Sequence, residues 1–224
     1  ILYPKVESFI KYQLFNREVE LSEAQTLRNL SELHPKEILK SSFKKAIDEL
    51  TVTDKGTAEV KNFISLKLTK PKITENQPFI VPKKSVFNKI IGDNPFELEL
   101  ASFLEGRFDD VTSYAKNTMG EGGVNFKIEY QAEDGNIREY YPDFFVKTEA
   151  KTFFILETKG REDLDDLLKI KRLVTWCKDI NFAQKEYIYM PIYVKQEKWE
   201  EIKNDLKSFN DVIKIFTITE NKEV

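Results

Sequence analysis

The stretch that decides the fold is residues 152–159, TFFILETK, a strongly apolar run that ends in two charged residues. Residues 140–147, YYPDFFVK, form a second strand-like run with an aspartate near its beginning. Side chains alternate between the two faces of a strand, so we expect Glu157 and Lys159 on the same face of a sheet. If the two runs pair as neighbouring strands, then Asp143, Glu157 and Lys159 converge at one end of that sheet.

These residue types suit metal-assisted chemistry at phosphorus. Two close carboxylates repel one another unless a divalent cation neutralises them, and Mg²⁺ prefers carboxylate oxygens, keeps several waters and often completes its shell with a phosphate oxygen. The backbone carbonyl of Thr158 can supply a further ligand. A metal-bound water is a better nucleophile because the metal lowers its pKa, and Lys159 can hold that water or stabilise charge on phosphorus. Spacing alone leaves a second interpretation open, in which Lys159 only forms a strand-end salt bridge with Glu157 or Asp143.

The composition excludes several other kinds of protein. The chain has 224 residues, a formal net charge of −3 and a pI of about 5.5, which argue against coating of nucleic acid by bulk charge. With Cys177 as the only cysteine and His34 as the only histidine, no intrachain disulfide can form and no zinc cluster can be built from these residues. Because His34 lies in a turn-like context, we expect no histidine-dependent triad either.

The order of expected elements divides the chain in two. Residues 1–85 are expected to form a mainly helical connector with a short strand at 60–68 and a proline-punctuated segment at 69–84. Residues 86–224 are expected to form an α/β domain whose mixed sheet is flanked by helices. The expected helices of this domain cover residues 95–105, 163–179 and 196–209, and its expected strands cover residues 124–130, 140–147, 152–159, 187–194 and 212–219.

Five segments form a joint pattern that is more specific than the three charged residues alone. They are DNPFELELASFLE at 93–105, YAKN at 114–117, YYPDF at 140–144, LETKGREDL at 156–164 and LVTWC at 173–177. Within them, Pro142-Asp143 is followed by Glu157-Thr158-Lys159, with Glu157 fourteen positions after Asp143. This pattern resembles the endonuclease domain of type III restriction enzymes, which belong to the PD-(D/E)xK nuclease superfamily. The resemblance covers about residues 87–194.

The resemblance implies a fold and a site. The fold is a restriction-endonuclease-like core with the order α-β-β-β-α-β. The implied catalytic residues are Asp143, Glu157 and Lys159, and the implied cofactor is Mg²⁺, with Mn²⁺ as a substitute. The metal ligands would be Asp143, Glu157, Thr158 and an acidic residue on the first core helix. For that residue we choose Glu97, because it shares a face with Leu100, Ala101 and Leu104; Glu99 is the alternative, and either can be an ordinary solvated glutamate.

The resemblance also implies partners. The activity would be that of a site-specific deoxyribonuclease of a bacterial defence system, acting on double-stranded DNA. In that family the nuclease follows an ATP-dependent motor in the Res subunit, and a Mod methyltransferase subunit recognises the DNA site. The chain has no Gly-x-x-x-x-Gly-Lys-Ser/Thr loop, so we expect ATP to bind only the motor of the parent protein. Lys116, Asn117 and Arg161 are the candidate DNA contacts, with a turn pair and a solvated surface as the ordinary alternatives.

Two other functions remain open from the sequence. The chain can be another nuclease of the superfamily, in DNA repair or type I restriction, or a nuclease-like scaffold without activity. It does not begin with Met, so we expect a fragment of a longer protein. No apolar run approaches the roughly 20 residues of a transmembrane helix and no signal peptide is recognisable, so we expect a cytoplasmic location without membrane contact.

Overall fold

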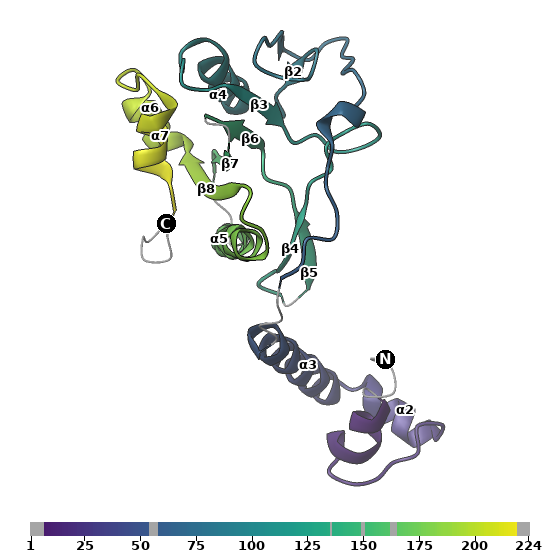
Figure 1. The fold of residues 1–224 in the computed structure, drawn as a ribbon. Helices are drawn as coiled ribbons and strands as arrows, with labels where there is room; N and C mark the ends of the chain where they lie inside the picture. The colour runs from purple at the N-terminus through teal and green to yellow at the C-terminus, as the bar shows by residue number, and fades with distance from the viewer. Residues whose placement is uncertain (1–6, 54–57, 135, 149–150, 162–164, 219–224) are drawn as a thin grey trace. The chain divides into compact units, whose positions relative to one another are not determined.

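The computed structural model describes residues 7–53, 58–134, 136–148, 151–161 and 165–218 (Figure 1). The chain divides into two compact units, Ile1–Gly56 and Thr57–Val224. This division falls earlier than the boundary that we expected between residues 85 and 86. The reason is that the segment before residue 86 contacts later parts of the second unit. For example, Lys70 N donates a hydrogen bond to Gly122 O at 3.0 Å.

The first unit is helical. Its described residues include a π-helix, η1 (Ile10–Leu14), and the α-helices α2 (Ala24–Ser31) and α3 (Leu33–Thr53), and residues 7–9 are also helical. Pro35 lies in the first turn of α3, where the missing N–H breaks no helical hydrogen bond. The rings of Phe9 and Phe43 meet edge to face, with 6.0 Å between their centroids, and join α3 to the residue that precedes η1.

A four-stranded mixed sheet forms the centre of the second unit. Its strands lie in the order β3 (Ser113–Lys116), β6 (Phe144–Lys147), β7 (Thr152–Lys159) and β8 (Ile188–Lys195). Strand β6 is antiparallel to both β3 and β7, whereas β7 and β8 are parallel. Parallel neighbours need a crossover connection, which α5 (Asp166–Ala183) provides. The expected α/β fold with a mixed sheet flanked by helices is therefore confirmed.

The remaining elements surround this sheet. In the second unit, a short 3₁₀-helix and two short strands precede helix α4, and two further helices follow β8. These elements are η2 (Leu66–Leu68), β1 (Phe79–Ile80), β2 (Ile90–Ile91), α4 (Pro95–Gly106), β4 (Ile128–Gln131), β5 (Ile137–Tyr140), α6 (Gln196–Ile202) and α7 (Phe209–Phe216). Strands β1 and β2 pair with each other, as do β4 and β5, outside the main sheet. No described helix has both the length and the apolar character that a membrane span requires.

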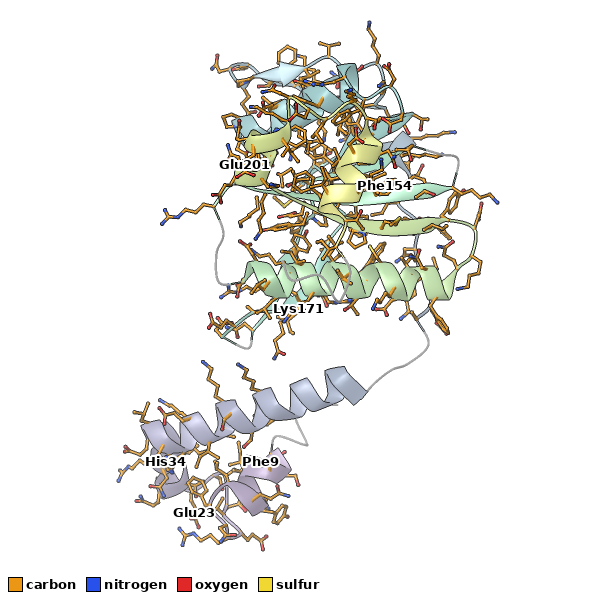
Figure 2. The ribbon with its side chains drawn as sticks, turned by 90° about the vertical axis from the view of Figure 1, so that its left-hand side faces the viewer. Phe9, Glu23, His34, Phe154, Lys171 and Glu201 are labelled. Atoms are coloured by element: carbon orange, nitrogen blue, oxygen red, sulfur yellow. The ribbon has the colours of Figure 1, made fainter. Side chains whose placement is uncertain are left out.

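Helices cover both faces of the sheet (Figure 1). On one face, Leu100 of α4, Trp199 of α6 and Phe209 of α7 are fully buried against the sheet core that includes Phe154. Figure 2 shows Phe154 among the side chains that fill this layer. On the other face, α5 and the β4–β5 hairpin pack around Ile155. Neighbouring residues of β7 thus enter opposite layers, as the period of two in a strand requires.

Both edges of the sheet are partly covered. Beside β3, Tyr114 N donates to Lys84 O at 2.9 Å. Beside β8, Thr217 forms an isolated antiparallel bridge with Ile192, and Ile218 N donates to Pro191 O at 3.3 Å. Short segments from before and after the sheet therefore occupy edges that would otherwise present free backbone groups.

The predicted strand at 152–159 is confirmed as β7, and those at 124–130 and 140–147 are corrected in part. Residues 124–127 are not in a strand; β4 begins at Ile128, ends at Gln131 and pairs with β5 in the hairpin. Its place beside β6 is taken by β3, which we did not predict because Ser113–Lys116 is short and does not alternate. The run 140–147 is interrupted before β6, where Pro142 lacks the N–H that a ladder needs.

Two other predicted strands are wrong. Within 60–68, residues 60–65 have no regular structure and Leu66–Leu68 is a 3₁₀-helix. Of the segment 212–219, residues 212–216 belong to α7, and residue 219 lies outside the described residues. The β-branched residues of this segment favoured a strand, but Ser208 and Asp211 form a capping box that starts a helix. The predicted helix 196–209 ends early, at Ile202.

Candidate active site

Asp143 lies directly before β6, where backbone hydrogen bonds hold it between β3 and β7. Its N–H donates to Leu156 O at 2.9 Å, and its carbonyl oxygen accepts from Asn117 N at 2.7 Å. Its carboxylate Oδ2 accepts from both Thr158 N, at 2.7 Å, and Thr158 Oγ1, at 2.6 Å. Main chain and side chain together therefore fix this aspartate at the end of the sheet.

Glu157 lies beside Asp143 on the neighbouring strand. In the antiparallel register of β6 and β7, Phe144 lies opposite Leu156. Asp143, one residue before Phe144, therefore lies opposite Glu157, one residue after Leu156. Glu157 Oε2 accepts a hydrogen bond from Tyr140 OH at 2.9 Å. Tyr140 belongs to the hydrophobic layer beneath α5, so Glu157 faces that helix. The structure thus brings the two predicted carboxylates together.

The two carboxylates resist ionisation. Burial raises the pKa of Asp143 to about 6; the negative charge of Glu97 adds to this shift, and Lys116 opposes it. Burial also raises the pKa of Glu157 well above its usual value, and the charge of Asp143 raises it further. Each group would ionise more readily if a cation lay beside it. Within the described residues, hydrogen bonds engage only Oδ2 of Asp143 and Oε2 of Glu157, so one oxygen of each remains available.

A pH dependence of stability follows from Asp143. When unfolded it loses its proton near pH 4, whereas in the folded, metal-free chain it does so at about 6. Between these values the folded chain binds more protons, so this group's contribution to stability falls as pH rises. We expect the unfolding free energy of Asp143→Asn, relative to wild type, to increase by on the order of 2 kcal/mol between pH 4 and pH 7. Urea unfolding in EDTA measures this, and a constant difference would contradict the prediction.

Glu97 is held by the start of its own helix and by a lysine from β3. It is the third residue of α4, and Asn94 caps the helix by accepting from Glu97 N at 3.0 Å. Glu97 Oε1 accepts from Asn94 Nδ2 and Oε2 accepts from Asp93 N, at 2.8 and 2.9 Å. Lys116 Nζ completes the set, at 2.6 Å from Glu97 Oε2 and 3.0 Å from Asp93 Oδ2.

Glu99, the alternative to Glu97, belongs to a different surface. Its Oε1 lies 2.5 Å from Lys203 Nζ, which follows α6. Glu97, in contrast, is close enough to Asp143 to raise the pKa of that group. Of the two glutamates, the structure therefore places Glu97 near the carboxylate pair, although its own oxygens already have protein partners.

The three candidate DNA contacts differ in exposure. Lys116 and Asn117 are buried, and Arg161 is exposed directly after β7. Asn117 Nδ2 donates to Phe126 O at 2.7 Å and to Pro142 O at 2.9 Å. Burial would lower the pKa of Lys116, but the carboxylates of Asp143, Glu97 and Asp93 raise it above its usual value. Both residues therefore act inside the protein. Asn117 fixes the backbone at Pro142 and Asp143 by hydrogen bonds, and the positive charge of Lys116 favours the ionised form of Asp143.

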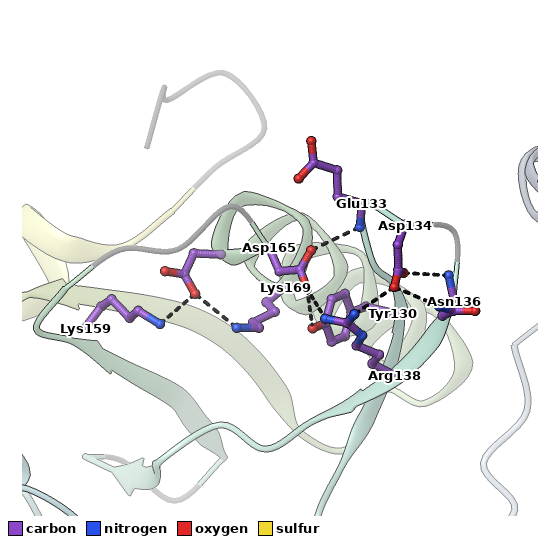
Figure 3. Close-up of polar contacts among 9 residues, drawn as sticks. Tyr130, Glu133, Asp134, Asn136, Arg138, Lys159, Asp165 and Lys169 are labelled. Atoms are coloured by element: carbon purple, nitrogen blue, oxygen red, sulfur yellow. Dashed lines mark hydrogen bonds and ion pairs between the residues drawn. The ribbon is translucent and has the colours of Figure 1, made fainter.

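Lys159 is held by a carboxylate that we did not predict. Figure 3 shows Lys159 and Lys169 converging on one carboxylate. The two ion pairs identify it as that of Asp166, in the first turn of α5. The distances from Asp166 Oδ1 are 2.8 Å to Lys159 Nζ and 3.2 Å to Lys169 Nζ. Asp143, Glu157 and Lys159 are all described, and no ion pair within 4 Å joins Lys159 to either carboxylate. The salt bridge that the spacing allowed is therefore not formed.

The neighbouring residue, Asp165, ties the β4–β5 hairpin to the same end of α5. Its carboxylate accepts from Tyr130 OH at 3.2 Å, from Glu133 N at 3.0 Å and from Arg138 Nη1 at 2.8 Å (Figure 3). These contacts hold the hairpin in place, and its last residue, Tyr140, donates the hydrogen bond to Glu157. Acidic residues are common in the first turn of a helix, so the pair Asp165 and Asp166 does not by itself mark a functional site. Only its position shortly after Lys159, at the end of β7, could have indicated that it holds site residues in place.

The carboxylates do not form a larger acidic cluster. Among the residues that the structure describes, no group of three or more His, Cys, Asp and Glu side chains could together hold a metal ion. Mg²⁺ is often bound by one or two carboxylates with several waters, so a pair such as Asp143 and Glu157 is sufficient. Comparison of the chain with family models, with curated proteins and with solved structures found no match.

Proposed function

We propose that the second unit is a Mg²⁺-dependent endonuclease domain that hydrolyses phosphodiester bonds of DNA. The observation that carries the proposal is the pair of half-buried carboxylates, Asp143 and Glu157, on neighbouring strands. Desolvation raises the pKa of both groups, and the charge of Asp143 raises that of Glu157 further. Lys159 lies on the strand of Glu157, two positions further along. A half-buried carboxylate pair with a nearby lysine suits the binding of a divalent cation and of a phosphate.

The connectivity supports the more specific proposal of a PD-(D/E)xK core. From α4 to β8, and without the β4–β5 hairpin, the second unit runs α4, β3, β6, β7, α5, β8, which is the α-β-β-β-α-β order implied by the resemblance. The aspartate precedes the second strand of that order, and the glutamate and lysine end the third. We infer on this basis that the chain is the cleavage module of a type III restriction enzyme Res subunit.

The residues present fit a Mg²⁺ ion. Asp143 and Glu157 would hold it through their available oxygens, together with the carbonyl of Thr158, as Mg²⁺ requires only a few protein ligands. Mn²⁺ would be a substitute. The bound ion would supply a more acidic water and would neutralise charge on the phosphate. Glu97 would act at a distance, by holding Lys116 beside Asp143, rather than as a direct ligand.

The protein groups have separate roles in this proposal. Thr158 fixes the orientation of Asp143 with two hydrogen bonds, and Tyr140 fixes that of Glu157 with one. Asp166 holds the ammonium of Lys159, which is largely buried, with 18% of the side chain exposed. Lys159 would orient the attacking water or stabilise the charge that develops on phosphorus.

Partners beyond the chain are part of the same proposal. The substrate would be double-stranded DNA, cleaved in the cytoplasm. A motor of the parent protein would use ATP, and a Mod subunit would read the recognition sequence. Arg161 stays a candidate contact with the DNA backbone, because its side chain is exposed next to the end of β7.

Cleavage of duplex DNA in Mg²⁺, by the chain and by its parent complex, tests the proposal. We expect Glu157→Gln and Lys159→Ala to lower the rate by about a hundredfold or more, because each removes a group that acts at the reacting phosphate. Asp205→Asn, on an exposed loop, is the matched control and should cleave as the wild type does. Undiminished cleavage by both site variants would contradict the assignment.

A scaffold without activity is the second candidate. It is favoured by the observation that the three acidic candidates Glu97, Asp143 and Glu157 all have protein hydrogen-bond partners. Calorimetry with Mg²⁺ or Mn²⁺ separates the two functions. Heat of binding that disappears in Glu157→Gln supports the endonuclease, and its absence in the wild type supports the scaffold.

A further inference from the structure

The segment before α4 is strongly basic, although the chain as a whole is acidic. Residues 58–91 contain seven lysines and only two glutamates, Glu59 and Glu75. The lysines are Lys61, Lys67, Lys70, Lys72, Lys83, Lys84 and Lys89. Since the net charge of the whole chain is −3, this segment is a local excess of positive charge.

Apolar side chains are exposed among these lysines. Phe63, Leu68 and Ile73 are 87%, 82% and 88% exposed. Exposed large apolar residues in one short segment are typical of a surface that meets a partner, whereas a merely solvated charged segment does not require them. The segment therefore combines charge with apolar contact area.

Two of the lysines, Lys70 and Lys72, contact the glycine-rich loop that follows β3, residues 117–126. Lys70 N donates to Gly122 O at 3.0 Å, and Lys72 Nζ lies 3.4 Å from the same oxygen. Gly122 has a φ of +71°, and a Cβ at this position would lie 2.5 Å from Lys70 Cβ. The loop thus allows the lysine segment to approach its backbone directly. Lys70 also forms an ion pair with Glu121 of the loop.

The loop connects the lysines to the carboxylate pair. Asn117 holds its far end, because Phe126 N donates to Asn117 Oδ1 at 3.1 Å and Asn117 Nδ2 donates to Phe126 O. The same Asn117 donates its N–H to Asp143 O at 2.7 Å. One ordered loop therefore separates Lys70 and Lys72 from the residue that carries the proposed activity.

We propose that Lys67, Lys70 and Lys72 bind the phosphate backbone of duplex DNA beside the candidate active site. This inference rests on the proposed function, because a DNA nuclease must hold its substrate near the reacting phosphate. Ammonium groups on an exposed segment suit contacts with successive phosphates, which are independent of sequence. Such contacts agree with the net negative charge of the chain, since they need only a local basic surface.

Binding of a fluorescent duplex of about 25 base pairs to the full chain in EDTA tests this surface without cleavage. Each phosphate contact contributes about 0.9 to the slope of log K against log salt. We expect the triple variant Lys67→Ala/Lys70→Ala/Lys72→Ala to bind at least about tenfold more weakly, with a slope smaller by about 2 to 3. The matched control replaces three exposed lysines of the α5 region, Lys171, Lys178 and Lys185, by alanine (Lys171 is labelled in Figure 2), and should bind within twofold of wild type.

A second variant tests the same surface by a change that should strengthen duplex binding rather than weaken it. Glu121→Gln removes the carboxylate that competes with phosphate for Lys70, so we expect severalfold tighter binding. No duplex binding by the wild type, or equal binding by wild type, triple variant and Glu121→Gln, would overturn the proposal. Equally tight binding of poly-glutamate that depends on the same lysines would also overturn it, because the partner would then be an acidic protein.

The two proposals fail in different ways. Glu157→Gln is expected to bind the duplex as wild type does while losing cleavage. If the wild type binds through these lysines and cleaves nothing in Mg²⁺, the lysine surface stands and the endonuclease proposal fails. If the wild type cleaves and the triple variant binds and cleaves equally well, the lysine surface fails and the endonuclease proposal stands.

Discussion

Asp143→Asn is expected to lower Mg²⁺-dependent cleavage by at least about a hundredfold and to make the metal-free chain more stable at neutral pH. The cleavage is lost because the amide removes one of the two charges that would hold the ion. The stability rises because the wild-type carboxylate, whose pKa burial raises to about 6, must be ionised inside the protein at neutral pH. Asparagine offers an oxygen to both Thr158 donors without carrying that charge.

Two measurements on the same samples check this prediction. Cleavage of duplex DNA in Mg²⁺ gives the activity, and urea unfolding in EDTA at pH 8 gives the stability. Asp205→Asn, an exposed aspartate, is the control for both. A variant that loses cleavage together with stability would show that Asp143 is a structural residue, and one that keeps full cleavage would remove it from the active site.

Lys116→Met is expected to destabilise the second unit by about 3–5 kcal/mol, because removal of one partner leaves a buried charge unpaired. Lys116 and Glu97 have side chains only 3% and 5% exposed and are joined at 2.6 Å. Methionine can occupy the volume of the lysine stem, so the loss arises from the charge rather than from packing. The pKa of Asp143 should also rise further, since Lys116 opposes its upward shift.

Removing the second partner should reverse part of this loss. In Lys116→Met/Glu97→Gln the buried position no longer carries a carboxylate, and the single amide oxygen of the glutamine can still accept from Asp93 N. Lys171→Met, on the exposed surface of α5, is the control and should change the unfolding free energy by less than about 0.5 kcal/mol. A loss in Lys116→Met that is no larger than this control would contradict the role of the ion pair.

Strand patterns in the sequence were enough to place part of the candidate site. The apolar run of β7 and its charged end predicted both the strand and the shared direction of Glu157 and Lys159, because alternation in a strand is a local property. The convergence of Asp143 and Glu157 was predicted on the condition that the two runs pair as neighbouring strands, and β6 and β7 do pair in the required register. These are features in which local preference and tertiary packing agree.

Long-range packing decided the features that the sequence analysis missed. Strand β3 has only four residues, and three consecutive ones are buried, so no alternation marks it. Residues 212–216 contain β-branched residues that favour a strand, but the burial of Phe209, Val212 and Phe216 on one side favours the helix. Asp166 and Tyr140 were missed as site residues because their partners, Lys159 and Glu157, lie 7 and 17 positions away.

The short covers on the two sheet edges have a consequence for association between copies of the chain. Strand β8 is eight residues long, and the Thr217 bridge and the Ile218 hydrogen bond lie beside its middle. A long, flat strand with free backbone groups is a template for pairing with another molecule. A chain that ended before Thr217 would therefore keep α7 and its core contacts yet expose β8, and we infer that it would tend to form intermolecular β-structure.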